Sequence, residues 1–248
     1  MNRPTATAAL AAAMTLLAAA AAISQSAEDI VRRMEDNQRF RTQEAEGTLI
    51  ITDRFGSRTK TFRSYAEGRE RMLLAFTNPE EKGQKILRLQ DEIYLYFPDA
   101  EEVVRLQGAA LKESVMGSDF SYEDLTGEKS VLDLYDVRLL GAERLDGREQ
   151  HLLELKAKGR GVAYPLQKLW VDAAQLVPRR AEYYALSGRL LKILEVVEVR
   201  QVAGRSVMSR AIMKDAMKKN SSTEFRVGRV KIDEALPRNI FSLEALSW

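Results

Sequence analysis

The residues that could do chemistry are few and lie far apart in the sequence. His151 is the single histidine, the chain has no cysteine, and Glu123 and Asp124 form an adjacent pair of carboxylates. A general base needs a reacting group within hydrogen-bond reach, and no nucleophile motif lies near His151. Its place in an alternating run favours an ordinary strand residue. Without cysteine, thiol catalysis and thiolate metal sites are excluded.

Glu123 and Asp124 are explained better by helix capping than by acid–base catalysis. Adjacent residues on a helix or strand point in different directions, so the two carboxylates do not face a common point. Ser121 precedes Asp124 by three residues, a spacing that favours the start of a short helical turn. The sequence also has no glycine-rich phosphate loop, no His-x-x-x-His pair and no serine elbow. We therefore expect no enzyme, no metal site and no cofactor.

The N-terminus has the pattern of a secretory signal peptide. Arg3 is the only charged residue before Glu28, and the apolar run 8–23 is followed by small residues within 24–27. The run is short and rich in alanine, which favours a cleaved signal over a membrane anchor. We expect residues 1–26 to be removed after export.

Residues 27–248 form, by this reading, one mature domain. About 220 residues are enough for a single β-rich domain. The chain has 38 basic and 36 acidic residues, and this near balance argues against a nucleic-acid partner. No disulfide is possible, so the exported domain must be held together by its core.

Alternating, β-branched segments follow the N-terminal region. Residues 47–54 and 57–65 are two such runs joined by a short turn at Gly56, which predicts a hairpin. Asp146-Gly147 is the turn signal of another hairpin. Strand candidates recur at spacings of about ten residues on both sides of residues 108–125, as in an antiparallel meander. The sequence therefore predicts one continuous sheet of about eleven antiparallel strands.

Three segments have a helical pattern instead. Residues 26–39 place three apolar side chains on one stripe, with acids in the first turn, as in an amphipathic helix. Residues 108–125 and 234–246 are shorter candidates. A wide sheet must curl because its strands twist. We expect a mainly β (α+β) fold in which these short helices cover the concave face of the sheet.

One face of the predicted sheet is apolar throughout, and it has two interpretations. It is either an ordinary core or the wall of a hydrophobic cavity that holds an acyl chain. The assignment of each side chain to a face depends on register, and a shift of one residue would invert it. Candidates for the cavity wall are Leu49, Ile51, Leu74, Phe76, Leu87, Leu95 and Trp170. Candidates for a plug or lid at its mouth are Met116, Phe120 and Tyr122.

Four segments closely resemble the bacterial outer-membrane lipoprotein-sorting proteins, the LolA-like family: residues 85–89, 93–98, 103–106 and 116–125. The Tyr-Phe-Pro strand end and the run Met-Gly-Ser-Asp-Phe-Ser-Tyr-Glu-Asp-Leu look like that family's signature. The resemblance implies a periplasmic protein with an incomplete, curled antiparallel barrel capped by helices. It also implies a lipid or lipoprotein acyl chain in the cavity, and often an inner-membrane transporter of the resistance-nodulation-division type as partner.

The expected function is that of a monomeric periplasmic carrier or chaperone. It would bind lipid or lipoprotein acyl chains in a hydrophobic cavity and help to deliver them to the outer membrane. The alternative is a regulatory or assembly protein of the same fold, which senses lipid or lipoprotein and acts through a membrane partner. A hydrolase is the third possibility. The lipoprotein carrier of the family is shorter than this chain, so the cargo stays open between lipoprotein and free lipid.

Overall fold

The computed structural model describes residues 26–126 and 129–247. Except for Ser26, the predicted signal peptide lies outside the described residues. Within them, no helix is both long and apolar enough to cross a membrane.

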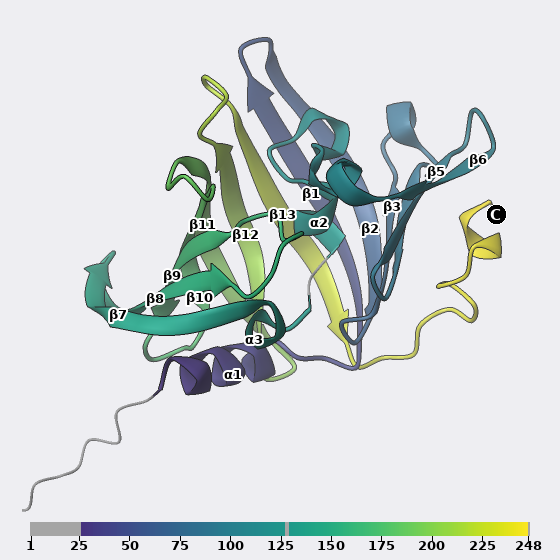
Figure 1. Ribbon diagram of the computed structural model, residues 1–248. Coiled ribbons are helices and arrows are strands. Elements are labelled where there is room, and N and C mark those ends of the chain that lie inside the picture. The colour runs from purple at the N-terminus through teal and green to yellow at the C-terminus, as the bar shows by residue number, and fades with distance from the viewer. Residues whose placement is uncertain (1–25, 127–128, 248) are drawn as a thin grey trace, which may run out of the picture.

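Thirteen strands of the described chain form one antiparallel sheet, in the order β6-β5-β4-β3-β2-β1-β13-β12-β11-β10-β9-β8-β7. The strands are β1 (Thr42–Asp53), β2 (Gly56–Glu67), β3 (Arg71–Phe76), β4 (Lys85–Leu89), β5 (Glu92–Phe97), β6 (Glu102–Leu106), β7 (Tyr135–Leu145), β8 (Arg148–Ala157), β9 (Leu166–Asp172), β10 (Pro178–Tyr184), β11 (Leu190–Val202), β12 (Arg205–Asp215) and β13 (Ser222–Ile232). The two edge strands, β6 and β7, do not pair with each other, so the curled sheet stays open (Figure 1). This confirms the predicted fold class, although the predicted count of about eleven strands was too low.

The sheet consists of two meanders, β1–β6 and β7–β13, which meet in its middle. The seam is the pairing of β1 with β13, and Figure 1 shows these two strands side by side. The chain leaves the first meander at edge strand β6 and enters the second at the opposite edge strand β7. The described parts of the connection between them (residues 107–126 and 129–134), called here the crossing segment, therefore lie across the sheet.

Within residues 26–126 and 129–247, three α-helices and four short 3-10 segments accompany the sheet. They are α1 (Ala27–Asn37), α2 (Tyr122–Thr126), α3 (Val131–Leu134), η1 (Pro79–Glu81), η2 (Gly108–Lys112), η3 (Val115–Gly117) and η4 (Glu244–Leu246). The predicted N-terminal helix is α1, whose cap is Ser26: the Ser26 hydroxyl accepts a hydrogen bond of 3.1 Å from the amide of Asp29. Ile30, Val31 and Met34 form its buried stripe.

The C-terminal segment covers a different face from the one expected. Only η4 is helical there, and its Leu246 packs in one cluster with Leu73, Leu87 and Tyr96. Leu74, adjacent to Leu73 on β3, belongs instead to the large cluster under the crossing segment. Because adjacent strand residues point to opposite faces, η4 lies on the side of the sheet away from that segment. The prediction that all three helical segments cover the concave face was wrong for this one.

Candidate functional site

A cavity of about 470 Å³ lies between the concave face of the sheet and the segments that cover it, and we call it the inner cavity. Its sheet wall comes from β1, β2, β3, β12 and β13, and its cover from α1, the chain after α1, and α2. Most of the wall is apolar; central members are Phe62, Leu74, Phe120, Leu125, Phe225 and Val227.

Three aromatic rings join the sheet to its cover. Phe62 of β2 and Phe225 of β13 stack with their centroids 5.6 Å apart and their planes 20° apart. Phe120 of the crossing segment tilts against Phe225 at 6.2 Å. Such aromatic pairs add to the free energy of burial. The seam between the meanders is therefore also the place where the cover is attached.

Most of the side chains predicted for the cavity wall belong to the same hydrophobic cluster as the aromatic residues that line the inner cavity. Leu49, Ile51, Leu74, Phe76 and Leu95 are buried in the cluster that contains Phe62 and Phe120. Leu74 and Phe120 also line the inner cavity itself. Met116 and Tyr122 pack against the cluster while half-buried. The structure thus brings eight of the ten predicted residues together, and their contact with lipid stays a prediction.

Leu87 and Trp170 were assigned to the wrong face. Leu87 packs with Leu246 on the opposite side of the sheet. Trp170 alternates with Leu169 and Val171, which pack under α1, so its indole points the other way. There the indole N–H donates to a carboxylate oxygen of Glu143 at 2.8 Å. Neither side chain belongs to the cavity wall.

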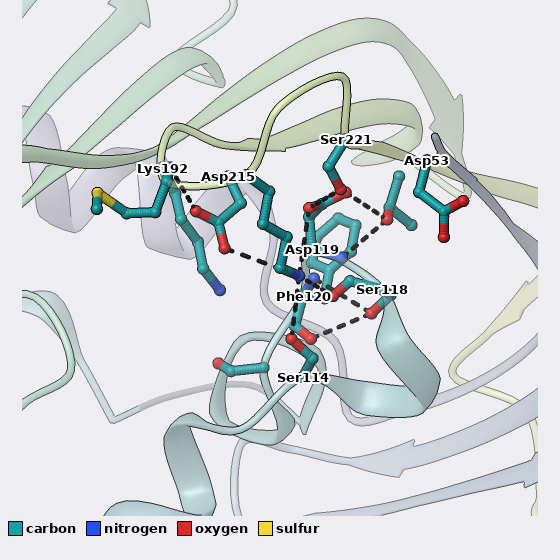
Figure 2. A network of polar contacts seen from close by, with 12 residues as sticks. Asp53, Ser114, Ser118, Asp119, Phe120, Lys192, Asp215 and Ser221 are labelled. Atoms are coloured by element: carbon teal, nitrogen blue, oxygen red, sulfur yellow. Dashed lines mark hydrogen bonds and ion pairs between the residues drawn. The ribbon is translucent and has the colours of Figure 1, made fainter. Parts of the chain in front are cut away.

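Asp119 fixes the crossing segment to the second meander. Its buried carboxylate accepts a hydrogen bond of 2.6 Å from the hydroxyl of Ser221, as Figure 2 shows. It accepts another, of 2.8 Å, from the hydroxyl of Thr223. The Thr223 oxygen in turn accepts from the amide of Asp119 at 2.8 Å. The Lys218 ammonium lies 3.6 Å from the Asp119 carboxylate. A buried carboxylate is stable only when it is paired and hydrogen-bonded, as this one is. The network therefore defines the position of Phe120, the next residue.

The backbone reverses sharply just before Asp119. Met116 has a φ of 50° and Gly117 a φ of 75°, two successive residues in the left-handed region. This conformation is costly for a side chain such as methionine. The surrounding contacts hold Met116 there, so the crossing segment has one defined path over the wall.

Asp124 and Ser121 form the predicted helix cap. The Ser121 hydroxyl accepts from the amide of Asp124 at 3.1 Å, and the Asp124 carboxylate accepts from the amide of Ser121 at 2.8 Å. The same carboxylate accepts from Lys192 at 2.9 Å and from the Tyr164 hydroxyl at 3.0 Å. Burial and the adjacent charge of Asp124 hold the pKa of Tyr164 far above its usual value, so Tyr164 remains a donor. Asp124 thus joins α2 to β11 and to the chain before β9.

Glu123 does not share these partners. Burial, and then the charge of Asp124, raises the pKa of Glu123. One of its buried oxygens has no hydrogen-bond partner among the described residues. The two carboxylates differ in surroundings, as expected when neighbours on a helix point apart.

Charged groups surround the end of the inner cavity beneath α1. Arg39, Arg69, Arg71, Lys129 and Arg205 all reach its lining, together with Glu35. Burial raises the pKa of Glu35. Hydrogen bonds that Glu35 accepts from Arg69, the Val131 amide and Ser130 outweigh this effect and hold the pKa below its usual value. This end is therefore polar where the rest of the wall is apolar.

Among the described residues, no group of three or more His, Asp or Glu side chains could hold a metal ion. His151 lies on β8 opposite Val171, at the far end of the sheet order from β2 and β3.

The residues that the sequence analysis overlooked are Phe62, Phe225 and the partners of Asp119. A signal for Phe62 was present, because Thr59, Thr61 and Arg63 mark the polar face of the same strand. Residues between them must face the other way. The Asp119 contacts had no comparable signal, since Thr223 is 104 positions away.

Solved structures similar to this chain cover nearly all of it. A DUF1329 family protein from Desulfovibrio piger aligns with a TM-score of 0.83 and 26% identity, over 88% of this chain and 96% of the other. An outer membrane lipoprotein-sorting protein domain from Vibrio parahaemolyticus aligns with a TM-score of 0.82 and 22% identity, over 90% of this chain and 98% of the other. A LolA superfamily protein from Nitrosomonas europaea aligns with a TM-score of 0.75 and 23% identity, over 89% of this chain and 99% of the other.

A comparison with curated proteins finds no match. A family model described as "uncharacterized protein" matches residues 68–248, which is well over half of the chain. The chain therefore belongs to that family, and it has the LolA-like fold of the outer-membrane lipoprotein-sorting proteins.

Proposed function

We propose that the protein is a periplasmic carrier or chaperone that binds lipid or lipoprotein acyl chains in the inner cavity and helps to deliver them to the outer membrane. The observation that carries this proposal is the apolar cavity of about 470 Å³ inside an open, curled sheet. Its volume lies within the range of small-molecule sites, roughly 300–1,000 Å³. The proposed activity is binding and transfer, without a chemical step.

Burial of methylene groups supplies the affinity in this proposal. Each CH2 removed from water contributes about 0.8 kcal/mol. Phe62, Phe120 and Phe225 offer a wall without charge along which a chain can lie. The names of two similar structures, a lipoprotein-sorting domain and a LolA superfamily protein, favour the same cargo class. An inner-membrane transporter of the resistance-nodulation-division type is the proposed membrane partner.

Native mass spectrometry of the protein purified from a periplasmic fraction tests the binding step. We expect a co-purifying lipid, and displacement of a fluorescent fatty acid by added lipid. Ala66 lines the cavity, so Ala66→Trp should fill it and weaken probe binding about tenfold or more, the equivalent of two buried methylenes. Thr59→Trp, on the exposed face of the same strand, is the matched control and should bind normally.

The absence of both co-purifying lipid and probe displacement would refute the proposal. Transfer is tested separately by mixing loaded protein with acceptor vesicles. A protein that binds the probe but never releases lipid to vesicles would fit the sensing function rather than carriage.

A further inference from the structure

Strands β12 and β13 pair over less than half of their length. The described ladder joins Arg210–Met213 with Thr223–Arg226 and includes no residue of 205–209 or 227–232. The neighbouring ladders continue past this point, β12 with β11 as far as Arg205 and β13 with β1 as far as Ile232. The sheet wall is thus divided between two of its central strands; we call this the β12–β13 split.

Bulges on both strands lie at the split. On β12, Ser209 is the extra residue between Arg210, which pairs with Glu198, and Met208, which pairs with Val199. On β13, Gly228 and Arg229 together oppose the single residue Glu46 of β1, because Ala45 pairs with Val230 and Gly47 with Val227. Such a two-against-one bulge bends its strand and increases the twist. The bend begins one residue after Arg226, the last residue of β13 that pairs with β12.

Arg200 replaces the missing ladder bonds. It belongs to β11, one strand beyond β12, and its guanidinium donates to the carbonyl of Val227 and, at 3.2 Å, to that of Gly228. In a continuous sheet, backbone amides of β12 would be the expected donors to this edge of β13. The split is therefore bridged by a side chain that can rotate away, not by backbone.

Outside the split lies a second hollow of about 910 Å³, which we call the outer groove. Five arginines line it: Arg63, Arg200, Arg210, Arg226 and Arg229. Four of them form ion pairs: Arg63 with Glu46, Arg200 with Glu198, and both Arg210 and Arg226 with Glu224. Five arginines against three glutamates leave an excess of two positive charges. Arg229 is exposed and has no ion-pair partner among the described residues.

The inner cavity and the outer groove share part of their walls. Phe62 and Val227 line both hollows. Phe62 can do so because Gly47 has no side chain: a Cβ there would lie 2.5 Å from the Phe62 ring. The apolar cavity and the arginine-lined groove thus share a wall of two side chains, of which Val227 lies at the split.

We propose that the protein binds anionic phospholipid through this junction, with the acyl chain in the inner cavity and the phosphate headgroup in the outer groove. The inference rests on the proposed carrier function and names its cargo class. Guanidinium groups hold phosphate through charge-assisted, often bidentate hydrogen bonds. The contiguity of the two hollows favours one amphiphilic ligand. An acidic peptide would need only the groove.

Two fluorescent lipids with identical acyl chains, one phosphatidylglycerol and one phosphatidylcholine, test the headgroup site in the full-length mature protein. Arg229→Ala should weaken binding of the phosphatidylglycerol about tenfold, as the loss of a charge-assisted contact predicts, and leave the phosphatidylcholine unchanged. Arg144→Ala, another exposed arginine without an ion-pair partner in the described chain, is the control and should change neither.

Equal binding of both lipids by the wild type and by Arg229→Ala would overturn this inference and leave the carrier function intact. Binding of neither lipid would refute the carrier function itself. Binding of an acidic peptide that competes with neither lipid would assign the groove to a protein partner and also overturn the inference.

A reversible cross-link tests the path between the hollows. Ser209 and Val227 are the first positions past the last ladder pair, so a Ser209→Cys/Val227→Cys disulfide would close the split. We expect tenfold slower loading from phosphatidylglycerol vesicles, restored by reduction. Thr52→Cys/Ser57→Cys, at the paired hairpin end where the native hydroxyls are 2.9 Å apart, is the control. Unchanged loading with the Ser209–Val227 bridge formed would refute passage through the split.

Discussion

The ammonium of Lys192 on β11 lies 2.9 Å from a carboxylate oxygen of Asp124 on α2, although 68 positions separate them in the sequence. Both side chains are largely buried, and the Tyr164 hydroxyl approaches the same carboxylate at 3.0 Å. This ion pair attaches α2, within the crossing segment, to the second meander. Asp119 attaches its middle to the same half of the sheet.

Asp124→Asn should lower the free energy of unfolding by about 3 kcal/mol, because it leaves the Lys192 ammonium buried without its counterion. Urea denaturation measures this. Lys214→Met is the matched control, since it removes an exposed ion pair of 3.1 Å with Glu195 and should cost less than about 1 kcal/mol. Equal losses of unfolding free energy in the two variants would show that the buried ion pair stabilises the protein no more than an exposed one.

Asp119→Asn should loosen the crossing segment before the sheet unfolds. The amide cannot accept both hydroxyl hydrogen bonds in the same way, and a buried donor is left without a partner. Hydrogen exchange should quicken in residues 113–126 and stay unchanged in β7–β9. Ser114→Ala, which removes a more exposed contact of 3.3 Å with Lys218, serves as the control. Uniform quickening throughout the sheet would contradict a local role for Asp119.

Gly47→Ala should destabilise the protein by about 2 kcal/mol, the usual range for overpacking. The added Cβ would lie 2.5 Å from the Arg226 carbonyl oxygen and 2.5 Å from the Phe62 ring. Gly228→Ala tests the same bulge from the other strand, where the nearest atom is 3.6 Å away, an ordinary contact. Thermal unfolding should separate the two variants clearly, and similar melting temperatures would be inconsistent with the close packing at Gly47.

Glu224 should contribute to stability in a pH-dependent way. Hydrogen bonds from Arg226 and Arg210 lower the pKa of Glu224 to about 2. A carboxyl group whose pKa is lowered by folding stabilises the protein above its ordinary pKa of about 4.3, and this contribution disappears as the pH falls toward the folded value. The difference in unfolding free energy between wild type and Glu224→Gln should therefore shrink as the pH falls from about 5 to about 2, the range that contains both pKa values. A difference that stays constant over this range would contradict the prediction.

Local rules predicted the parts of the molecule that depend on neighbouring residues. The Ser26 cap of α1 and the reciprocal cap of Ser121 and Asp124 are both present. The turn at Asp146-Gly147 joins β7 to β8, with positive φ at both residues as a tight hairpin turn requires. These features need only a few adjacent side chains, so sequence spacing is enough to identify them.

Assignment to a face failed where a strand is buried on both sides. Ile86, Leu87 and Arg88 are all buried, as are the four residues from Leu169 to Asp172. Hydrophobic alternation identifies a face only when the other face is exposed. The sequence of β4 and β9 therefore gives no indication that Leu87 and Trp170 point away from the cavity. The opposite side of β4 is covered by η4, whose docking also depends on long-range contacts.

The seam between β1 and β13 has a consequence for how the inner cavity forms. Gln43 pairs with Ile232, so the two strands that carry the middle of the cavity wall come from nearly opposite ends of the chain. Contacts of such large sequence separation form slowly, because much loop entropy is lost before they form. Each meander can assemble from local hairpins, but neither encloses the cavity. We therefore expect the inner cavity, the proposed site for an acyl chain, to form in one late step of folding, when β13 docks against β1.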